Sequence, residues 1–594
     1  MIDATLSVGS LRDRYAAGET TPADVVADVY ARIAARGDDH VWISLVPQES
    51  ALAAAAAHDP ADLDRLPLYG VPYALKDNID VAGLVTTAAC PDFAYTATTT
   101  ARLVEQLTAA GAILVGKTNL DQFATGLNGT RSPYGAPASV GDPDLISGGS
   151  SSGSAVAVAA GLVSFSIGTD TAGSGRVPAA LNGIVGMKPS IGLVSSTGLV
   201  PACRSLDCAS VFSLDVADGA AVLAVLSGFD AADPWSRRLP APPRSVTAAE
   251  PRRLRLGVPA TIASWGERGE QGAWALLLAQ LRRAGVEIVD LAMDDFFAAG
   301  SQLYQGVWLA ERLDGLEELL RDRPESVLPE LRAVLAGGDA IRGVETFAAL
   351  THMQALRQRT HALLAGVDAL LAPTVTETFG IEQMRADPVA LNSRLGRFTT
   401  FTNLLDLCAV ALPAGVTSHG VPFGVTVQAV AGRDAEVAAI AASIEAVVAG
   451  RTIEVAADLG DGFELAVVGA HLEGMPLHAD LIGRGAQLVQ RTATSSAYQL
   501  HALRGTVPAK PGLRRVESAG VAIEVEVYRL PAAAVAGFLA TVVAPLAIGQ
   551  VELADGRFVH GFVCEPLALE GADDISEHGG WRAYQAQRAA LVGE

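Results

Sequence analysis

Two short segments rich in glycine and serine constrain this chain more than any other feature. Residues 147–154 are all Gly or Ser, and a second glycine-containing turn is predicted at residues 172–175. Between them, residues 155–162 are small and apolar, as in a buried helix, and residues 163–167 alternate as in a strand. Pro178 then suits the first turn of another helix. A flexible linker could share the composition of the first segment, but this order of turn, helix, strand, turn and helix indicates a folded core.

The chemistry that such turns favour is nucleophilic catalysis. Glycine lets the backbone approach a ligand closely, and a turn at a helix start leaves N–H groups free to stabilise an oxyanion. Ser150 and Ser174 lie in the two turns. A serine hydroxyl needs a base, and none of the ten histidines has a motif that points to Ser174. Lys76, in the apolar segment 73–79, could be this base if burial lowers its pKa.

Lys76 and two segments, residues 148–151 and 168–178, resemble the signature of the amidase signature family, whose members are hydrolases with a Ser–Ser–Lys triad. The resemblance implies that Ser174 is the nucleophile and that Ser150 relays its proton to Lys76. It also implies an oxyanion hole built from the backbone N–H groups of four consecutive residues, Thr171, Ala172, Gly173 and Ser174. No cofactor and no metal ion is expected.

A second interpretation of the first turn is open from the residues alone. Residues 149–153 also fit the Gly-x-Ser-x-Gly nucleophile elbow, with Ser151 as the nucleophile. That motif needs a strand directly before it and a later Asp and His, and we expect no strand at residues 141–146. The family resemblance implies instead a cis peptide bond between Gly149 and Ser150.

Four further segments resemble the allophanate hydrolases within this family, namely residues 87–91, 119–126, 172–175 and 201–208. The chain departs from the usual signature, which has Gly where Ser152 and Ala172 stand and a larger residue where Gly175 stands. The resemblance covers most of the chain and implies hydrolysis of allophanate, N-carboxyurea, to ammonia and carbon dioxide or bicarbonate. A general small-molecule amidase or an amidotransferase A-type subunit is the alternative.

The resemblance also implies three substrate-binding residues, Gly126, Tyr304 and Arg312. Allophanate is an anion, and its carboxylate suits the fork-shaped guanidinium of arginine. Tyr304 and Arg312 are eight positions apart, which places them about two turns apart on a single predicted helix. An exposed arginine paired with Glu311 or Glu317 is the alternative.

Hydrophobic periodicity predicts two domains. Over residues 1–450, helices alternate with apolar strands, which indicates an α/β fold with a mixed central sheet flanked by helices. Residues 451–464 form a polar, acidic connector. Residues 465–594 then contain several predicted strands, with the clearest period-2 alternation at residues 521–528, and predict a small β-rich domain.

The C-terminal domain of allophanate hydrolases is associated with decarboxylation of the first product, N-carboxycarbamate, and resembles γ-glutamylcyclotransferase-like barrels. In this chain His471 lies at the end of a predicted strand beside glycines and is the candidate catalytic residue, with Lys510 as a weaker candidate. Histidine titrates near neutral pH and could supply or accept the proton. A purely structural histidine is the alternative.

Charge and composition exclude several kinds of partner. The 594 residues carry a formal net charge of −22, which argues against nucleic acid and anionic membranes. No apolar run approaches the ~18 residues of a membrane span, and residues 1–6 lack a signal-peptide pattern. The five scattered cysteines favour free thiols in a reducing compartment. We expect a cytoplasmic homodimer that acts on a small anionic amide, with an implied functional link to urea carboxylase or biuret hydrolase.

Overall fold

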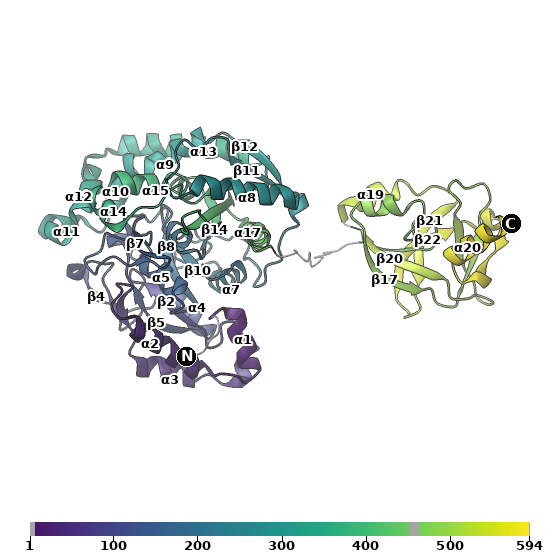
Figure 1. Cartoon of the computed structure of the whole chain (residues 1–594), viewed down its shortest axis with the longest axis horizontal. Coiled ribbons are helices and arrows are strands. Elements are labelled where there is room, and N and C mark those ends of the chain that lie inside the picture. The colour runs from purple at the N-terminus through teal and green to yellow at the C-terminus, as the bar shows by residue number, and fades with distance from the viewer. Residues whose placement is uncertain (1–5, 451–462, 531, 593–594) are drawn as a thin grey trace. The chain divides into compact units, whose positions relative to one another are not determined.

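The computed structural model describes three stretches of the chain, residues 6–450, 463–530 and 532–592. The chain divides into two compact units, Met1–Val455 and Ala456–Glu594 (Figure 1). The predicted connector, residues 451–464, lies outside the described residues except for its last two positions. No helix in the described part of the chain is long and apolar enough to cross a membrane.

The N-terminal unit is built around one mixed sheet of 11 strands. Their spatial order is β1 (Trp42–Leu45), β5 (Ile113–Thr118), β2 (Pro72–Lys76), β8 (Phe165–Asp170), β10 (Cys208–Ser213), β9 (Val185–Lys188), β14 (Leu407–Val416), β15 (Pro422–Val430), β13 (Ala369–Pro373), β11 (Arg255–Pro259) and β12 (Glu287–Leu291). β2 pairs in parallel with both β5 and β8, whereas β10 pairs antiparallel with β8 and β9. The predicted α/β fold class is confirmed.

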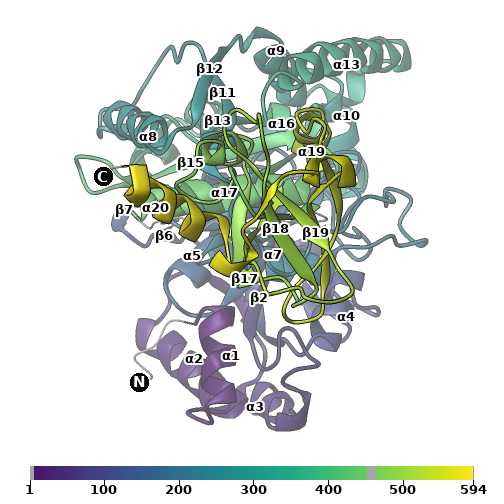
Figure 2. The ribbon, with the colours of Figure 1, turned by 90° about the vertical axis from the view of Figure 1, so that its right-hand side faces the viewer.

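The helices of this unit flank the sheet. They are α1 (Val8–Ala16), α2 (Pro22–Arg36), α3 (Gln48–Ala56), α4 (Arg102–Ala109), α5 (Ser152–Ala159), α6 (Val177–Asn182), α7 (Val216–Leu226), α8 (Glu270–Ala284), α9 (Asp294–Gln305), α10 (Trp308–Leu313), α11 (Glu317–Asp322), α12 (Pro329–Leu335), α13 (Gly343–Leu364), α14 (Ile381–Ala386), α15 (Ala390–Leu395), α16 (Phe401–Leu404) and α17 (Asp434–Val448). Figures 1 and 2 agree that α1, α2 and α3 gather at one end of the unit and that α8, α9 and α13 gather at the opposite end.

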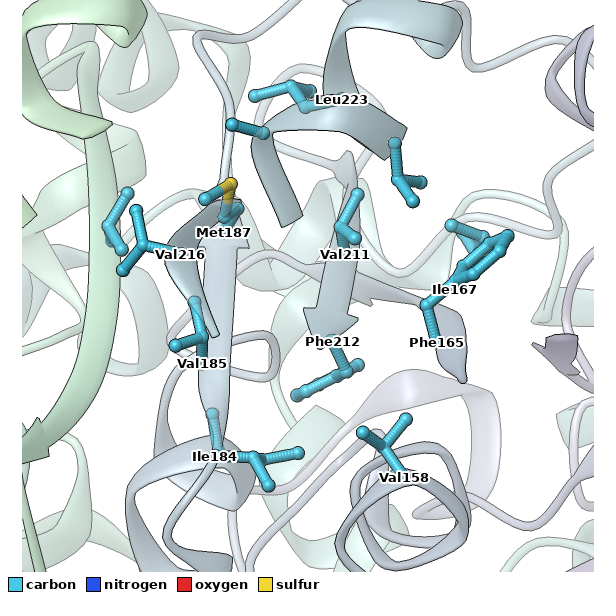
Figure 3. Packing of buried hydrophobic residues seen from close by; sticks show 14 of the residues in the cluster. Val158, Phe165, Ile167, Ile184, Val185, Met187, Val211, Phe212, Val216 and Leu223 are labelled. Carbon is cyan, nitrogen blue, oxygen red and sulfur yellow. The ribbon is translucent and has the colours of Figure 1, made fainter. Parts of the chain in front are cut away.

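Buried side chains from both faces of the sheet fix the strands that carry the site (Figure 3). Val211 and Phe212 are consecutive in β10, so their side chains point to opposite faces. Phe212 lies on the same side as Val158 of α5, and Val211 on the same side as Leu223 of α7. α5 begins directly after the first glycine-serine turn, so packing of α5 on the sheet positions that turn.

One local prediction was wrong. Residues 142–146 were expected to lack a strand, but β7 (Asp142–Ile146) pairs antiparallel with β6 (Ala138–Ser139). Asp142-Pro-Asp has little intrinsic preference for a strand. Pairing with β6 forms the strand despite this low preference, and the β6–β7 hairpin is a separate sheet from the central one.

The described part of the C-terminal unit is rich in strands. One five-stranded sheet has the order β17 (Gln487–Ala493), β20 (Glu524–Leu530), β16 (Phe463–Val467), β22 (Phe558–Cys564) and β21 (Leu546–Glu552). A three-stranded sheet contains β19 (Pro511–Arg515), β18 (Tyr498–Ala502) and β23 (Asp573–Asp574). The helices are α18 (His478–Gly483), α19 (Ala532–Leu539) and α20 (Trp581–Val592). The predicted β-rich domain is therefore present, and its likeness to γ-glutamylcyclotransferase-like barrels stays a prediction.

The close packing of α5 predicts a strong difference between two glycine substitutions. A Cβ on Gly153 of α5 would overlap the backbone O of Val41 and lie 2.8 Å from the N of Asn119, and backbone atoms cannot move away cheaply. Gly153→Ala should therefore destabilise the N-terminal unit by about 1–3 kcal/mol. Gly272→Ala in α8 is the matched control, because nothing lies within 4 Å of its Cβ position.

Gly272→Ala should stabilise the protein by about 0.5–1 kcal/mol, because alanine is a better helix former than glycine. Differential scanning calorimetry of both full-length variants measures the two shifts. Equal transition temperatures for the two variants would show that α5 is not packed as described.

Candidate active site

Lys76 and the two glycine-serine turns meet at one edge of the sheet. Lys76 ends β2, and the turn that carries Ser174 follows β8, the parallel neighbour of β2. The carboxyl ends of parallel strands lie at the same edge, which brings these residues together. The first turn contacts the start of α6, because a Cβ on Gly148 would lie 2.9 Å from the Cα of Pro178.

Lys76 is fully buried, unlike the solvated lysine that is usual at a strand end. Its Nζ donates hydrogen bonds to Ser150 Oγ at 2.8 Å and to Thr169 Oγ1 at 2.7 Å. Burial lowers the pKa of Lys76 to about 7, against the opposing effect of nearby carboxylates. Near neutral pH a large share of the side chain is therefore the neutral amine that a general base has to be. The condition for Lys76 to act as the base is thus met, and its catalytic role stays a prediction.

The predicted proton relay needs two hydrogen bonds, and among the described residues one of them is present. Ser150 Oγ is bonded to Lys76, whereas Ser174 Oγ has no hydrogen-bond partner among the described residues. Catalytic hydrogen bonds often tighten only when a substrate binds. The roles of Ser174 and Ser150 stay predictions. The peptide bond between Gly149 and Ser150 is cis, as predicted.

The nucleophile turn is held by Asp170, at the end of β8. Its carboxylate accepts hydrogen bonds from the N–H groups of Gly173 and Gly175, each at 3.0 Å, and from Arg176. The Gly173 N–H is thus already used, which removes it from the four predicted oxyanion donors. Three of those N–H groups have no partner within the described residues, those of Thr171, Ala172 and Ser174.

Gly126 has a structural reason to be glycine. A Cβ there would lie 2.7 Å from the carboxylate carbon of Asp121. That carboxylate is fully buried and accepts hydrogen bonds from the N–H groups of Gly129 and Arg131 at 3.2 and 3.0 Å. Burial raises the pKa of Asp121, although Arg131 and these N–H groups oppose the shift. The substrate-binding role of Gly126 stays a prediction.

The nucleophile-elbow alternative finds no support in the contacts of Ser151. Its Oγ donates to the backbone O of Thr169 at 3.1 Å and accepts from the N–H of the same residue at 3.3 Å. No histidine among the described residues contacts Ser151. The strand at residues 142–146 meets one requirement of the elbow, but the base is missing, and Ser151 instead ties the first turn to β8.

Arg312 is buried with an incomplete set of partners. Its side chain is 3% exposed, and Nη1 donates to Thr125 Oγ1 at 3.0 Å. Nε and Nη2 are buried without any partner, and no carboxylate among the described residues pairs with the guanidinium. The ring of Tyr304 lies 4.9 Å from Cζ of Arg312. A surface ion pair with Glu311 or Glu317 is therefore excluded within the described residues.

Tyr304 and Arg312 are not on one helix, contrary to the prediction. α9 ends at Gln305, Gly306 is extended, and Arg312 belongs to the separate helix α10. Glycine has the lowest helix propensity of the residues in this segment, which accounts for the break. The two side chains still meet, because the chain turns between the helices.

In the C-terminal unit, His471 lies at the wall of a cavity of about 260 Å³ that Lys510 and Asp480 also line. Its ring stacks on Phe562 with centroids 5.2 Å apart. Burial lowers the pKa of His471 to about 4, and Asp480 offsets this only in part. This corrects the expected titration near neutral pH, because at pH 7 the neutral ring can accept a proton but cannot supply one.

In the described part of the chain, no three His, Cys, Asp or Glu side chains lie close enough together to hold a metal ion. The side chains of Lys76 and Arg312 are both buried, and each donates to hydroxyl groups. Their arrangement suits acyl transfer at a serine, with a neutral amine as the base and N–H groups for an oxyanion.

Comparisons with known proteins agree with this geometry. Residues 24–438 match the model of the amidase family, and residues 463–586 match that of the allophanate hydrolase C-terminal domain. The chain belongs to the amidase family, as the signature predicts.

Three relatives define its neighbourhood. Urea amidolyase of Saccharomyces cerevisiae is 40% identical over 92% of this chain, which spans only 31% of that protein. A solved structure of Kluyveromyces lactis allophanate hydrolase is 37% identical, covers 97% of this chain and 99% of its own, and superposes with a TM-score of 0.80. The A-type subunit of glutamyl-tRNA(Gln) amidotransferase from Cereibacter sphaeroides is 33% identical over 70% of this chain and 92% of its own.

Several side chains that hold the site were not predicted from the sequence. They are Asp121, Thr125, Thr169 and Asp207. Each lies in a segment that carried the family resemblance, and that position in a motif is the sequence signal that could have identified it. A polar side chain within a motif is a candidate for holding the backbone, but its partner is a long-range contact that the sequence does not specify.

The lowered pKa of Lys76 predicts a pH dependence that needs no knowledge of the substrate. A fluorophosphonate should react with Ser174, forming a bond from Oγ to phosphorus with loss of fluoride. Below the pKa of Lys76 the ammonium form cannot take the serine proton, so the labelling rate should rise about tenfold per pH unit and level off above about 7.

Labelling is measured by mass spectrometry on the full-length protein. Ser174→Ala should abolish labelling, and Lys76→Ala and Ser150→Ala should each slow it severely. The two effects should not multiply in the double variant, because the residues act as a unit. Ser50→Ala, at an exposed position of α3, is the control and should label normally. A rate that does not change between about pH 5 and 9 would contradict Lys76 as the base.

Proposed function

We propose that the N-terminal unit hydrolyses allophanate and releases ammonia from its amide end. The observation that carries this proposal is Arg312, whose buried Nε and Nη2 have no partner and no opposing carboxylate among the described residues. Leaving such donors unpaired is costly, and a carboxylate that accepts from both would satisfy them together. Allophanate has its carboxylate and its amide at opposite ends of a short molecule.

In the proposed reaction, Ser174 Oγ attacks the amide carbon while its proton passes through Ser150 to neutral Lys76. The developing oxyanion accepts hydrogen bonds from the free N–H groups of Thr171, Ala172 and Ser174, each worth roughly 10²–10³-fold in rate. The proton then goes to the departing nitrogen, which leaves as ammonia. Water attacks the acyl-serine and releases N-carboxycarbamate.

The substrate carboxylate would bind between Arg312 and Tyr304. Thr125 holds one nitrogen of the guanidinium and so fixes its orientation. The neighbouring backbone at Gly126 is close to Asp121 and has no Cβ, so we propose that it forms the adjoining wall of the pocket.

A general amidase or an amidotransferase A-type subunit is the alternative function. The match to the amidotransferase protein covers 70% of this chain, whereas the two family models together extend over both units. This favours allophanate hydrolysis. The likeness to urea amidolyase further supports a source of substrate in urea carboxylation, with biuret hydrolysis as the second route. We also propose a homodimer that works in the cytoplasm.

The carboxylate pocket predicts substrate-selective loss in Arg312→Lys. Lysine keeps the charge but cannot present two fixed, parallel donors. kcat/KM for allophanate should fall roughly 10- to 100-fold, the equivalent of one charged hydrogen bond, with a much smaller fall for neutral malonamide. Ammonia release from allophanate, biuret, malonamide and glutamine measures the effect.

Arg332→Lys is the matched control, because Arg332 is an exposed arginine of the nearby helix α12. It should leave all four rates unchanged. Equal losses on allophanate and malonamide in Arg312→Lys would mean that Arg312 is structural and that allophanate is not the preferred substrate.

We propose that the C-terminal unit decarboxylates N-carboxycarbamate. The support is the cavity beside His471, in which Lys510 offers a cation for one of the two carboxylates of this product. When carbon dioxide leaves, the C–N bond breaks and the nitrogen takes up a proton. Neutral His471 cannot supply that proton at pH 7, so we propose Lys510 as the donor and His471 as a hydrogen-bonding group that orients the substrate.

This proposal predicts that His471→Ala and Lys510→Ala release the first ammonia normally and clear the intermediate slowly. N-carboxycarbamate should then persist long enough to be seen by carbon NMR with labelled allophanate, and a chain that ends at Gly450 should show the same. His560→Ala, an exposed histidine of the same unit, is the control. Clearance at the wild-type rate in both cavity variants would leave this unit without a catalytic role.

A further inference from the structure

Glu311, the residue before Arg312 in α10, is bound by a loop and not by the arginine. The loop comprises residues 201–207. Its Ser205 donates to Glu311 through the backbone N–H at 2.7 Å and through Oγ at 2.6 Å, and Cys203 Sγ donates at 2.9 Å. Three donors thus occupy one carboxylate. This explains why the nearest acidic residue in sequence leaves the Arg312 guanidinium free.

The other end of the same loop is tied to the nucleophile turn. Asp207 is buried, and its carboxylate accepts a hydrogen bond from Thr171 Oγ1 and two more from N–H groups of its own loop. Asn403 Nδ2 donates to the backbone O of both Leu206 and Asp170, at 2.9 and 2.8 Å. The 201–207 loop therefore connects the turn that carries the nucleophile to the helix that carries Arg312.

The 201–207 loop adds a polar restraint to α10 next to Arg312, whereas the buried Trp308 fixes the other end of the helix in the apolar core. α10 has six residues, and the break at Gly306 separates it from α9. Within the described residues, the Arg312 side chain itself has a single hydrogen bond, to Thr125. A helix this short is not stable by itself, so contacts with neighbouring elements set its place.

We propose that Glu311 is a positioning residue that sets the distance between the carboxylate-binding guanidinium and the nucleophile, and so determines selectivity for amides that carry a carboxylate. The inference rests on the proposed function of Arg312. A two-pronged contact tolerates little displacement, and a misplacement of about 1 Å can cost as much as 100-fold in rate. A neutral amide makes no such contact and is insensitive to the same displacement.

The experiment compares allophanate with malonamide in the full-length protein. Glu311→Ala should lower kcat/KM for allophanate by roughly tenfold or more, mainly through KM, and lower that for malonamide less than about threefold. Glu311→Gln keeps an acceptor for the Ser205 N–H and should restore much of the loss. Ser205→Ala should also lower kcat/KM for allophanate more than that for malonamide. Its effect should not add to that of Glu311→Ala, because the hydrogen bond from Ser205 Oγ is lost in both variants.

Glu317→Ala is the control for removal of an acidic side chain, since Glu317 is exposed on α11 and should leave both rates unchanged. If Glu311→Ala fails to fold, Ser205→Ala and Glu311→Gln test the positioning role instead, because each keeps some of the hydrogen bonds between residue 311 and the loop. Loss of equal size on both substrates, or no loss on either, would overturn the positioning role.

Arg312→Lys is measured alongside to separate the two proposals. If Arg312→Lys loses the preference for allophanate and the Glu311 and Ser205 variants keep it, only the positioning role fails. If wild-type protein shows no preference for allophanate, the proposed function fails and the role of Glu311 fails with it.

Discussion

The buried ion pair between Asp170 and Arg176 holds the candidate active site together. Arg176 Nε and Nη2 each lie 2.9 Å from one oxygen of the Asp170 carboxylate, which also fixes the N–H groups of Gly173 and Gly175. Burial is the largest effect and opposes the charged form, but Arg176, Lys188 and the Gly175 N–H together outweigh it and hold the pKa of Asp170 below its ordinary value. Breaking one partner of such a pair costs about 3–5 kcal/mol. The turn that presents Ser174 therefore depends on this contact.

Three buried cations near the sheet show how the partner, and not burial alone, decides chemical behaviour. Arg176 has a carboxylate at 2.9 Å, and so does Lys117, whose Nζ lies 2.9 Å from Asp77. Lys76 instead donates to hydroxyl groups, which stabilise the ammonium form less than a carboxylate would. Desolvation then dominates and brings its pKa to about 7. Burial lowers the pKa of Lys117 as well, and there the Asp77 carboxylate in direct contact opposes the shift.

Local patterns predicted the two turns, the family and the strands of the central sheet that carry the site, because each depends on neighbours in sequence, whereas they missed β7. The contact between Arg312 and Thr125 joins residues 187 positions apart, and the sequence contains no sign of it. The single helix predicted for Tyr304 and Arg312 failed because one glycine lets the chain turn. The expected titration of His471 failed because aromatic burial is a tertiary property. The Arg312 contact and the pKa of His471 depend on the tertiary environment, whereas the break between the two helices follows from the local preference of Gly306.

An acidic protein can bind an anion because long-range repulsion is weak and local desolvation is strong. The net charge of −22 acts over distances at which salt screens it, beyond about 8 Å at physiological ionic strength. Arg312 is buried, and two of its donors lack partners in the part of the chain that the structure describes. Free enzyme therefore carries a penalty that a carboxylate removes and a neutral amide does not. Sites with unmet polar groups reject analogues that lack the matching group far more strongly than apolar pockets do. In the proposed function, selectivity for a carboxylate arises from the unsatisfied donors of Arg312, and the 201–207 loop would hold those donors in place.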